Sequence, residues 1–158
     1  MPMTSPKVRQ AHPDDAPQIA IMCELLWPDA PAAEHRVEIE QMLRTGRCGT
    51  LPGAIFVSYG SESDDLTGFL QVGLRSHADG CDPEHAVGFI EGWFVYEGFR
   101  NQSIGKALSA AAEDWARAQG CVEMASDALI DNDVSFRAHQ ALGYEVVDRC
   151  IHFRKPLR

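Results

Sequence analysis

The stretch "VYEGFRNQSIGKAL", residues 95–108, decides the fold, because an apolar strand ends before it and an amphipathic helix begins after it. Residues 100–106 form the turn, which contains Arg100, Lys106 and a single glycine, Gly105. A helix N-terminus exposes unpaired backbone N–H groups and the positive end of the helix dipole, so this turn favours an anion such as phosphate. Neither the P-loop nor the dinucleotide-binding glycine pattern is present. Taken alone, the turn also fits a surface loop with two solvated cations.

The segments around this turn predict a mixture of strands and helices. The apolar run "AVGFIEGWFVY" at 86–96 is typical of a strand inside a sheet, and apolar residues recur at helical spacing from 104 to 118. Other predicted strands are 7–11, 53–59, 66–76, 121–128 and one or two closing strands in 144–157, and other predicted helices are 12–27, 32–46 and 132–143. We therefore expect an α/β (α+β) fold with a mixed central sheet of about six to seven strands flanked by about four helices.

Length and composition predict one domain over residues 1–158, with 45% hydrophobic and 23% charged residues. The net charge of -9 opposes binding to nucleic acid or to an anionic membrane and favours a cationic partner. The sequence shows no signal peptide and no apolar run of about 18 residues, so we expect a cytoplasmic protein. Its five cysteines are scattered without a C-x-x-C pair, so we expect neither disulfides nor a metal site.

The turn resembles a coenzyme-binding signature. The order strand, "FRNQSIGKAL", helix is similar to the acetyl-coenzyme A motif of the GNAT N-acetyltransferases, which has the pattern Q/R-x-x-G-x-G/A. Arg100 takes the first place and Gly105 the last, while Ser103 stands where a glycine is usual. A hydroxyl at this place can cap the helix or bond a phosphate, but it restricts the backbone more than glycine does.

Five further fragments resemble one branch of this superfamily, the aminoglycoside 6'-N-acetyltransferases. They are "LWP" at 26–28, "GCD" at 80–82, "FIEGWFV" at 89–95, "EMASD" at 123–127 and "HQALGYE" at 139–145. The resemblance implies acetyl-CoA as cosubstrate, a cationic aminoglycoside as acceptor and a homodimer. The apolar closing strands can pair across the two-fold axis of such a dimer.

The resemblance also implies which residues bind the coenzyme. The backbone of the strand end pairs with the pantetheine arm, the turn receives the pyrophosphate, and an asparagine touches the coenzyme from the next helix. These residues are Trp93, Phe94 and Val95 in the strand, Arg100, Asn101, Gln102, Ser103, Ile104, Gly105 and Lys106 in the turn, and Asn132 in the helix. For Trp93 and Phe94, core packing of the side chains is the alternative.

Glu91 is the most informative single residue, because a carboxylate inside an apolar strand is costly unless it is partnered or faces a cleft. By resemblance it binds the substrate amine and acts, through water, as general base; the alternative is a salt bridge to an internal arginine. Asp127 and Asp148 match acidic substrate positions, although each alone fits a surface acid. Trp27 and His77 match positions that face the sugar, and a core aromatic is the alternative for Trp27.

Many GNAT enzymes carry a tyrosine as general acid in the last helix, where this sequence has His139. The histidine can donate a proton, but it also fits a structural role, and no proton donor is assigned. The leading hypothesis is acetyl transfer to the 6'-amine of an aminoglycoside. Another GNAT acceptor, such as a polyamine, a metabolite amine or a protein amine, is the alternative, and a non-catalytic acyl-CoA-binding module is the third hypothesis.

Overall fold

The computed structural model describes residues 5–158 and contains a mixed six-stranded sheet with four α-helices in that range. The strands are β1 Lys7–Gln10, β2 Arg47–Cys48, β3 Leu51–Tyr59, β4 Leu66–Arg75, β5 Val87–Val95 and β6 Met124–Ser126. The helices are α1 Ala16–Leu26, α2 Ala32–Thr45, α3 Ile104–Ala118 and α4 Asp133–Ala141, with 3-10 turns at Pro13–Asp15 and Glu97–Phe99. The predicted fold class, strand number and helix number are confirmed.

The sheet has the order β1-β3-β4-β5-β6, and β2 pairs with β3. Its first four members are antiparallel, whereas β5 and β6 are parallel. The short strand β6 pairs only with residues 88–90 of β5. In the part of the chain that the structure describes, residues 91–95 of β5 therefore have no strand on that side, and their backbone edge is open.

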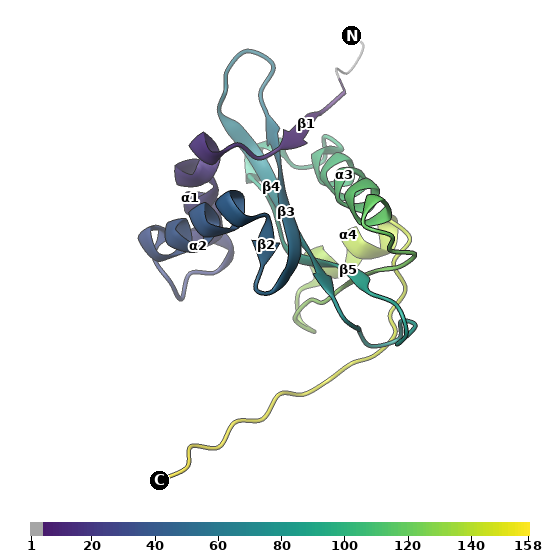
Figure 1. The fold of residues 1–158 in the computed structure, drawn as a ribbon. Helices are drawn as coiled ribbons and strands as arrows, with labels where there is room; N and C mark the ends of the chain where they lie inside the picture. Colours follow the sequence, from purple (N-terminus) through teal and green to yellow (C-terminus); the bar gives the residue numbers. More distant parts are fainter. Residues whose placement is uncertain (1–4) are drawn as a thin grey trace.

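Helices cover both faces of the sheet, as the sequence predicts (Figure 1). On one face α1 and α2 pack with Phe69 and Val57 in an apolar cluster. On the other face α3 packs with Leu70, Val72 and Ile90 in a second cluster. Burial of apolar surface in these two clusters stabilises the sandwich of helices around the sheet.

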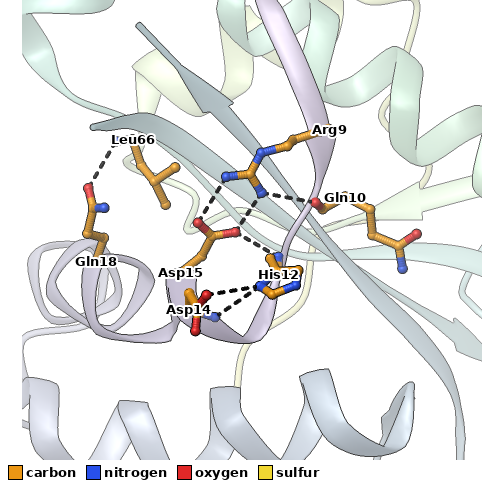
Figure 2. Close-up of polar contacts among 7 residues, drawn as sticks. All are labelled: Arg9, Gln10, His12, Asp14, Asp15, Gln18 and Leu66. Atoms are coloured by element: carbon orange, nitrogen blue, oxygen red, sulfur yellow. Dashed lines mark hydrogen bonds and ion pairs between the residues drawn. The ribbon is translucent and has the colours of Figure 1, made fainter. Parts of the chain in front are cut away.

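An ion pair fixes the junction between β1 and α1 (Figure 2). Arg9 in β1 donates two hydrogen bonds to the carboxylate of Asp15, with distances of 2.7 and 3.0 Å. The same carboxylate accepts the backbone N–H of His12 at 2.7 Å and so caps the turn that leads into α1. Burial raises the pKa of Asp15, but the bonds from Arg9 and His12 outweigh burial and hold this pKa below its ordinary value.

The prediction of closing strands in residues 144–157 is wrong. Residues 142–158 form no helix or strand. Tyr144 still packs against the apolar cluster under α3, whereas Figure 1 shows the end of the chain running away from the body of the molecule. Ile151, Phe153 and Leu157 are each at least 79% exposed. Alternating apolar residues favour a strand, but a strand forms only when it pairs with an edge, and among the described residues this segment pairs with no other strand.

Other elements follow the predicted boundaries with smaller differences. Helix α2 ends at Gly46, whose φ of 64° is left-handed, as expected of a glycine that ends a helix. The sequence did not indicate β2, because two residues are too short for a period to be recognised. Among the helices of residues 5–158, none combines the length and the apolar character that a bilayer span requires.

Candidate active site

A β-bulge places Glu91 at the point where β5 loses its β6 partner. Opposite β4, Gly92 pairs with Gln71 and Ile90 pairs with Val72, so Glu91 is the extra residue between two ladder positions. Bulges of this kind turn a side chain away from its regular alternation and are common beside functional sites. The carboxylate of Glu91 lies on the sheet face that carries Gly73, on which a Cβ would lie 3.7 Å from Oε1.

Trp27 lies beside this bulge. It ends α1, its indole packs on the ring of Phe69, and a Cβ placed on Gly92 would collide with that indole. Glycine at 92 is therefore required by the close approach of Trp27. Trp27 and Glu91 were each predicted to bind the substrate, and the indole of Trp27 lies against Gly92, the neighbour of Glu91, although helix end and strand are distant in sequence.

Glu91 forms an ion pair with Arg75 at the end of β4. Arg75 Nε and one terminal nitrogen donate to the two carboxylate oxygens at 3.1 and 2.9 Å. The structure thus contains the internal salt bridge that was the alternative interpretation of Glu91. Hydrogen bonds to Glu91 raise the pKa of Arg75, and the charges of Glu91 and Asp127 add to that rise.

Asp127 and Cys48 complete this part of the site. Asp127 follows directly after β6, and its negative charge acts on Arg75 together with that of Glu91. Cys48 in β2 faces Gly73 and lies 3.6 Å from the amide nitrogen of Gln71. Burial raises the pKa of the Cys48 thiol, so this side chain lines the site in its neutral form.

The two other predicted substrate residues lie outside this cluster. His77 is exposed in the loop after β4, where its Nδ1 contacts the hydroxyl of Ser76 at 3.3 Å. Asp148 is exposed in the segment after α4, and its Oδ1 accepts the backbone N–H of Arg149. The chain by itself does not bring Asp148 to Glu91, because the segment that carries Asp148 does not fold back onto the sheet.

The predicted coenzyme strand is the unpaired half of β5. Trp93 and Val95 pack on the α3 face, while Phe94 packs on the α1 face, so core packing accounts for all three side chains. Their backbone edge faces away from β4 and has no strand partner in the described residues. A linear ligand can pair with this edge as an added strand does.

The turn between β5 and α3 has an unusual backbone. Asn101 and Ser103 both have a φ of 62°, in the left-handed region that glycine adopts at least cost. Ser103 is the N-cap of α3, but its hydroxyl makes no capping hydrogen bond, so of the two roles that the sequence allowed, the cap is not formed. The left-handed backbone explains why a glycine suits this position.

Two turn residues have structural contacts of their own. Arg100 Nε donates to the carbonyl oxygen of Val95 at 2.9 Å and ties the turn to the end of β5. A Cβ on Gly105 would lie 3.0 Å from the indole of Trp93, so glycine there permits close packing of α3 on β5. Lys106, in the first turn of α3, is exposed. The backbone N–H groups at the start of a helix have no partner within the helix, and at the start of α3 they are flanked by Arg100 and Lys106.

On α4, Asn132 and His139 are both tied to the local backbone. Asn132 Oδ1 accepts the N–H of Ser135 at 3.0 Å and caps the helix, which leaves its amide nitrogen free to donate to a ligand. His139 Nδ1 lies 2.7 Å from the carbonyl oxygen of Ser135, and its Nε2 lies 2.7 Å from the hydroxyl of Ser126. A carbonyl only accepts, so Nδ1 carries a proton, while the hydroxyl of Ser126 can donate to Nε2 or accept from it.

Sequence analysis did not identify Arg75, Gly92 or the bulge. Arg75 stands at the end of a predicted strand, and a basic residue there normally reaches solvent. A carboxylate in one apolar strand and an arginine in the neighbouring strand are the only signal of such a pair. Their register depends on the bulge, which has no recognisable sequence pattern here.

The sheet that opens between β5 and β6, together with the turn before α3, defines the class of protein. The family described as "Acetyltransferase (GNAT) family" matches residues 19–144. This range covers most of the chain, including the open strand edge and the turn. The chain belongs to the GNAT acetyltransferase family.

Relatives with similar sequences share one name. The chain is 39% identical to an aminoglycoside N(6')-acetyltransferase type 1 of Klebsiella aerogenes over 98% of this chain and 99% of the relative. It is 35% identical to the protein of that name from Stenotrophomonas maltophilia over 98% of this chain and 95% of the relative. The alignments cover both proteins almost from end to end.

Solved structures agree with this grouping. The aminoglycoside acetyltransferase AAC(6')-Iy, in complex with the bisubstrate analogue CoA-S-monomethyl-acetylneamine, has a TM-score of 0.85 at 32% identity and covers 98% of this chain and 100% of its own. AAC(6')-Ih from Acinetobacter baumannii has a TM-score of 0.83 at 26% identity, with coverage of 97% and 99%.

Proposed function

We propose that this protein transfers the acetyl group of acetyl-CoA to the 6'-amine of an aminoglycoside and thereby confers resistance, with residues 1–158 acting as one catalytic domain. The observation that carries the proposal is the position of Glu91, which a bulge places beside Trp27 where the coenzyme edge of β5 begins. The names of the relatives and the bisubstrate complex of AAC(6')-Iy support the same acceptor.

The coenzyme fits the open half of β5 and the turn before α3. The backbone of residues 93–95 offers hydrogen-bonding groups to the pantetheine arm, and an N–H there polarises the thioester oxygen. The pyrophosphate lies on the N-terminus of α3 between Arg100 and Lys106, where unpaired N–H groups and the helix dipole favour negative charge. The free amide nitrogen of Asn132 donates to the coenzyme from the neighbouring helix.

Acetyl transfer itself requires a neutral amine in line with the thioester carbonyl. The substrate ammonium is drawn to the carboxylates of Glu91 and Asp127 and lies against the indole of Trp27. Glu91 accepts its proton through a water molecule, and the amine nitrogen then attacks the carbonyl carbon. The new C–N bond forms and the nitrogen releases its second proton to solvent, while the C–S bond breaks and the coenzyme thiolate takes up a proton from solvent.

A pair of aminoglycosides tests this proposal, one with an amine at 6' and one with a hydroxyl there. An amine needs only to lose its ammonium proton, whereas a hydroxyl needs a much stronger base than a carboxylate. We expect acetylation of kanamycin or tobramycin at N6', located by mass spectrometry, and almost no turnover of the 6'-hydroxy analogue. An acetyl group on another ring amine, or turnover of polyamines alone, would contradict the proposal.

We also propose that the protein works as a cytoplasmic homodimer in which a second copy covers the segment after α4. Apolar side chains of this segment are exposed in the single chain, among them Val147, Ile151, Phe153 and Leu157. Helix α4 has no buried residue, and the outer edge of β6 is free in the described chain. Burying each large apolar side chain contributes about 1.5–3 kcal/mol, so pairing of this segment with the sheet of a partner is strongly favoured.

The molar mass in solution tests the dimer. We expect light scattering during size-exclusion chromatography to give two chains for the intact protein. The double substitution Ile151→Asp and Phe153→Asp should give one chain, while Arg154→Ala, an exposed neighbour without an apolar side chain, serves as the matched control. A monomeric intact protein at micromolar concentration would contradict this part of the proposal.

A further inference from the structure

The ion pair beside the proposed acceptor site has a stacking contact in addition to its hydrogen bonds. The guanidinium of Arg75 lies 3.4 Å from the centroid of the Phe89 ring, so it is fixed from one side by stacking. From the other side it donates in a fork to both oxygens of Glu91. Stacking and a bidentate fork are properties of arginine that a lysine does not reproduce.

The two hydrogen bonds from Arg75 leave part of the acceptor capacity of the Glu91 carboxylate unused. Two carboxylate oxygens offer about four lone-pair sites, and Arg75 is the one hydrogen-bond donor to Glu91 among residues 5–158. The side chain of Glu91 is 22% exposed. It therefore keeps acceptor capacity toward solvent, on the side that an incoming ammonium or water molecule can reach.

Glu91 also needs an external restraint more than an ordinary strand residue does. As the extra residue of a bulge it has no partner residue opposite it on β4, and a glutamate side chain has three rotatable bonds. Arg75, at the end of the neighbouring strand, supplies the restraint by binding both oxygens. A displacement of a reacting group by about 1 Å can reduce a rate by about 10²-fold.

We infer that Arg75 is a positioning residue for acetyl transfer: it holds the carboxylate of Glu91 at the bulge while leaving acceptor sites for the substrate ammonium. This inference rests on the proposed function and deepens it by assigning an auxiliary residue to the same site. Arg75 also balances charge, because its guanidinium pairs with Glu91 and feels the charge of Asp127, so that the three groups together carry one net negative charge.

This dual role gives an unusual kinetic expectation. Loss of the guanidinium leaves two uncompensated carboxylates, which attract a cationic substrate at least as well as before. The same loss frees the Glu91 side chain and lowers the fraction of complexes in reacting geometry. Arg75→Met should therefore lower kcat by about tenfold while KM for the aminoglycoside stays the same or falls. General damage to the site would raise KM together with the loss in kcat.

The test is a double-mutant cycle on purified full-length protein with kanamycin and acetyl-CoA. The variants are Arg75→Met, Arg75→Lys, Glu91→Gln and the double variant Arg75→Met with Glu91→Gln. If Arg75 acts through Glu91, its loss has no further effect once Glu91 is replaced, so the double variant should match Glu91→Gln within about twofold. Arg75→Lys should recover part of kcat, since it restores the charge without the fork.

A matched control is Arg117→Met, which removes an exposed arginine that pairs with Asp114 on α3. We expect it to leave kcat and KM unchanged. The thermal shift caused by acetyl-CoA should be the same in all variants, which shows that each is folded and binds coenzyme. If Arg75→Met does not fold, the cycle is measured with Arg75→Lys.

Two outcomes separate the inference from the function on which it rests. Additive losses in the double variant, or an Arg75→Met enzyme with unchanged kcat, would overturn the role of Arg75 alone. Absence of aminoglycoside acetylation by the unsubstituted protein would overturn the proposed function and, with it, this inference.

Discussion

The molecule contains two ion pairs of the same design in very different surroundings. Arg9 binds both oxygens of Asp15 at 2.7 and 3.0 Å, and Arg75 binds both oxygens of Glu91 at 3.1 and 2.9 Å. In each case an arginine on a strand reaches a carboxylate on a neighbouring segment. The chemistry of the fork is thus the same, and only the environment differs.

The environment decides what each pair can do. The side chain of Asp15 is 8% exposed and accepts a further hydrogen bond from the backbone of His12, so the chain itself uses its acceptor capacity (Figure 2). The side chain of Glu91 is 22% exposed and accepts from Arg75 alone among the described residues. The first pair is arranged for folding, whereas the second retains capacity for a ligand.

The largest expected effect is on stability. Asp15→Asn removes the charge that Arg9 binds and weakens the cap on His12, so the free energy of unfolding should fall by about 3 kcal/mol. Urea unfolding followed by circular dichroism measures this loss. Asp114→Asn, which breaks an exposed pair on α3, is the control and should cost at most about 1 kcal/mol. Equal losses in the two variants would show that burial does not distinguish the pairs.

The second expected effect is on catalysis. Glu91→Gln removes the proposed proton acceptor but keeps the shape of the side chain, so kcat should fall by about 10²-fold. The free energy of unfolding should change by no more than about 1 kcal/mol. Steady-state kinetics and urea unfolding of the same preparation check both values. A large loss of stability with little change in kcat would reverse the assignment of the two pairs.

The third expected effect is a pH dependence confined to the Asp15 pair. The pKa of Asp15 is lowered in the folded protein, so its ionised form contributes stability above the pKa of the unfolded chain, about 3.9. That contribution is lost as the pH falls through the folded pKa. The difference in unfolding free energy between the unsubstituted protein and Asp15→Asn should therefore be largest near pH 7 and shrink below about pH 4. A difference that is constant over this range would contradict the role of the charge.

The smallest expected effect is that of salt. Asp127 and the partly exposed Arg75–Glu91 pair attract a cation through solvent. The Debye length in solvent is about 10 Å at 0.1 M salt and shortens to about 3 Å at 1 M. KM for the aminoglycoside should rise several-fold over this range. The stability contributed by the Arg9–Asp15 pair should hardly change. The affinity for acetyl-CoA at the same pH is the reference. A larger effect of salt on unfolding than on KM would contradict the comparison.

Much of the fold follows from local sequence patterns. Helices α1, α2, α3 and α4 and strands β1, β3, β4 and β5 are within a few residues of the ranges that periodicity and glycine positions predict. The closing segment is the exception, since its apolar alternation predicts strands that the chain does not form. Hydrophobic periodicity shows which side chains of a segment can be buried. Whether the segment finds a strand edge to pair with depends on the rest of the structure.

The sequence predicted which residue types belong to the candidate site, but it did not predict how they are arranged in space. Glu91 was recognisable because a carboxylate in an apolar strand is costly, and the turn before α3 because two cations flank a helix start. The sequence had also allowed the hydroxyl of Ser103 to cap that helix. In the structure, Ser103 provides a left-handed backbone instead.

The sequence by itself determined the layered sheet, the family and the acidic and aromatic residue types of the candidate site, because hydrophobic period and a short motif are local properties. Tertiary structure alone decided that Arg75 binds Glu91, that Trp27 covers Gly92 and that β5 is open beyond Ile90. Each of these depends on the register between segments far apart in the chain. One bulged residue in β5 shifts that register, and no local pattern specifies it.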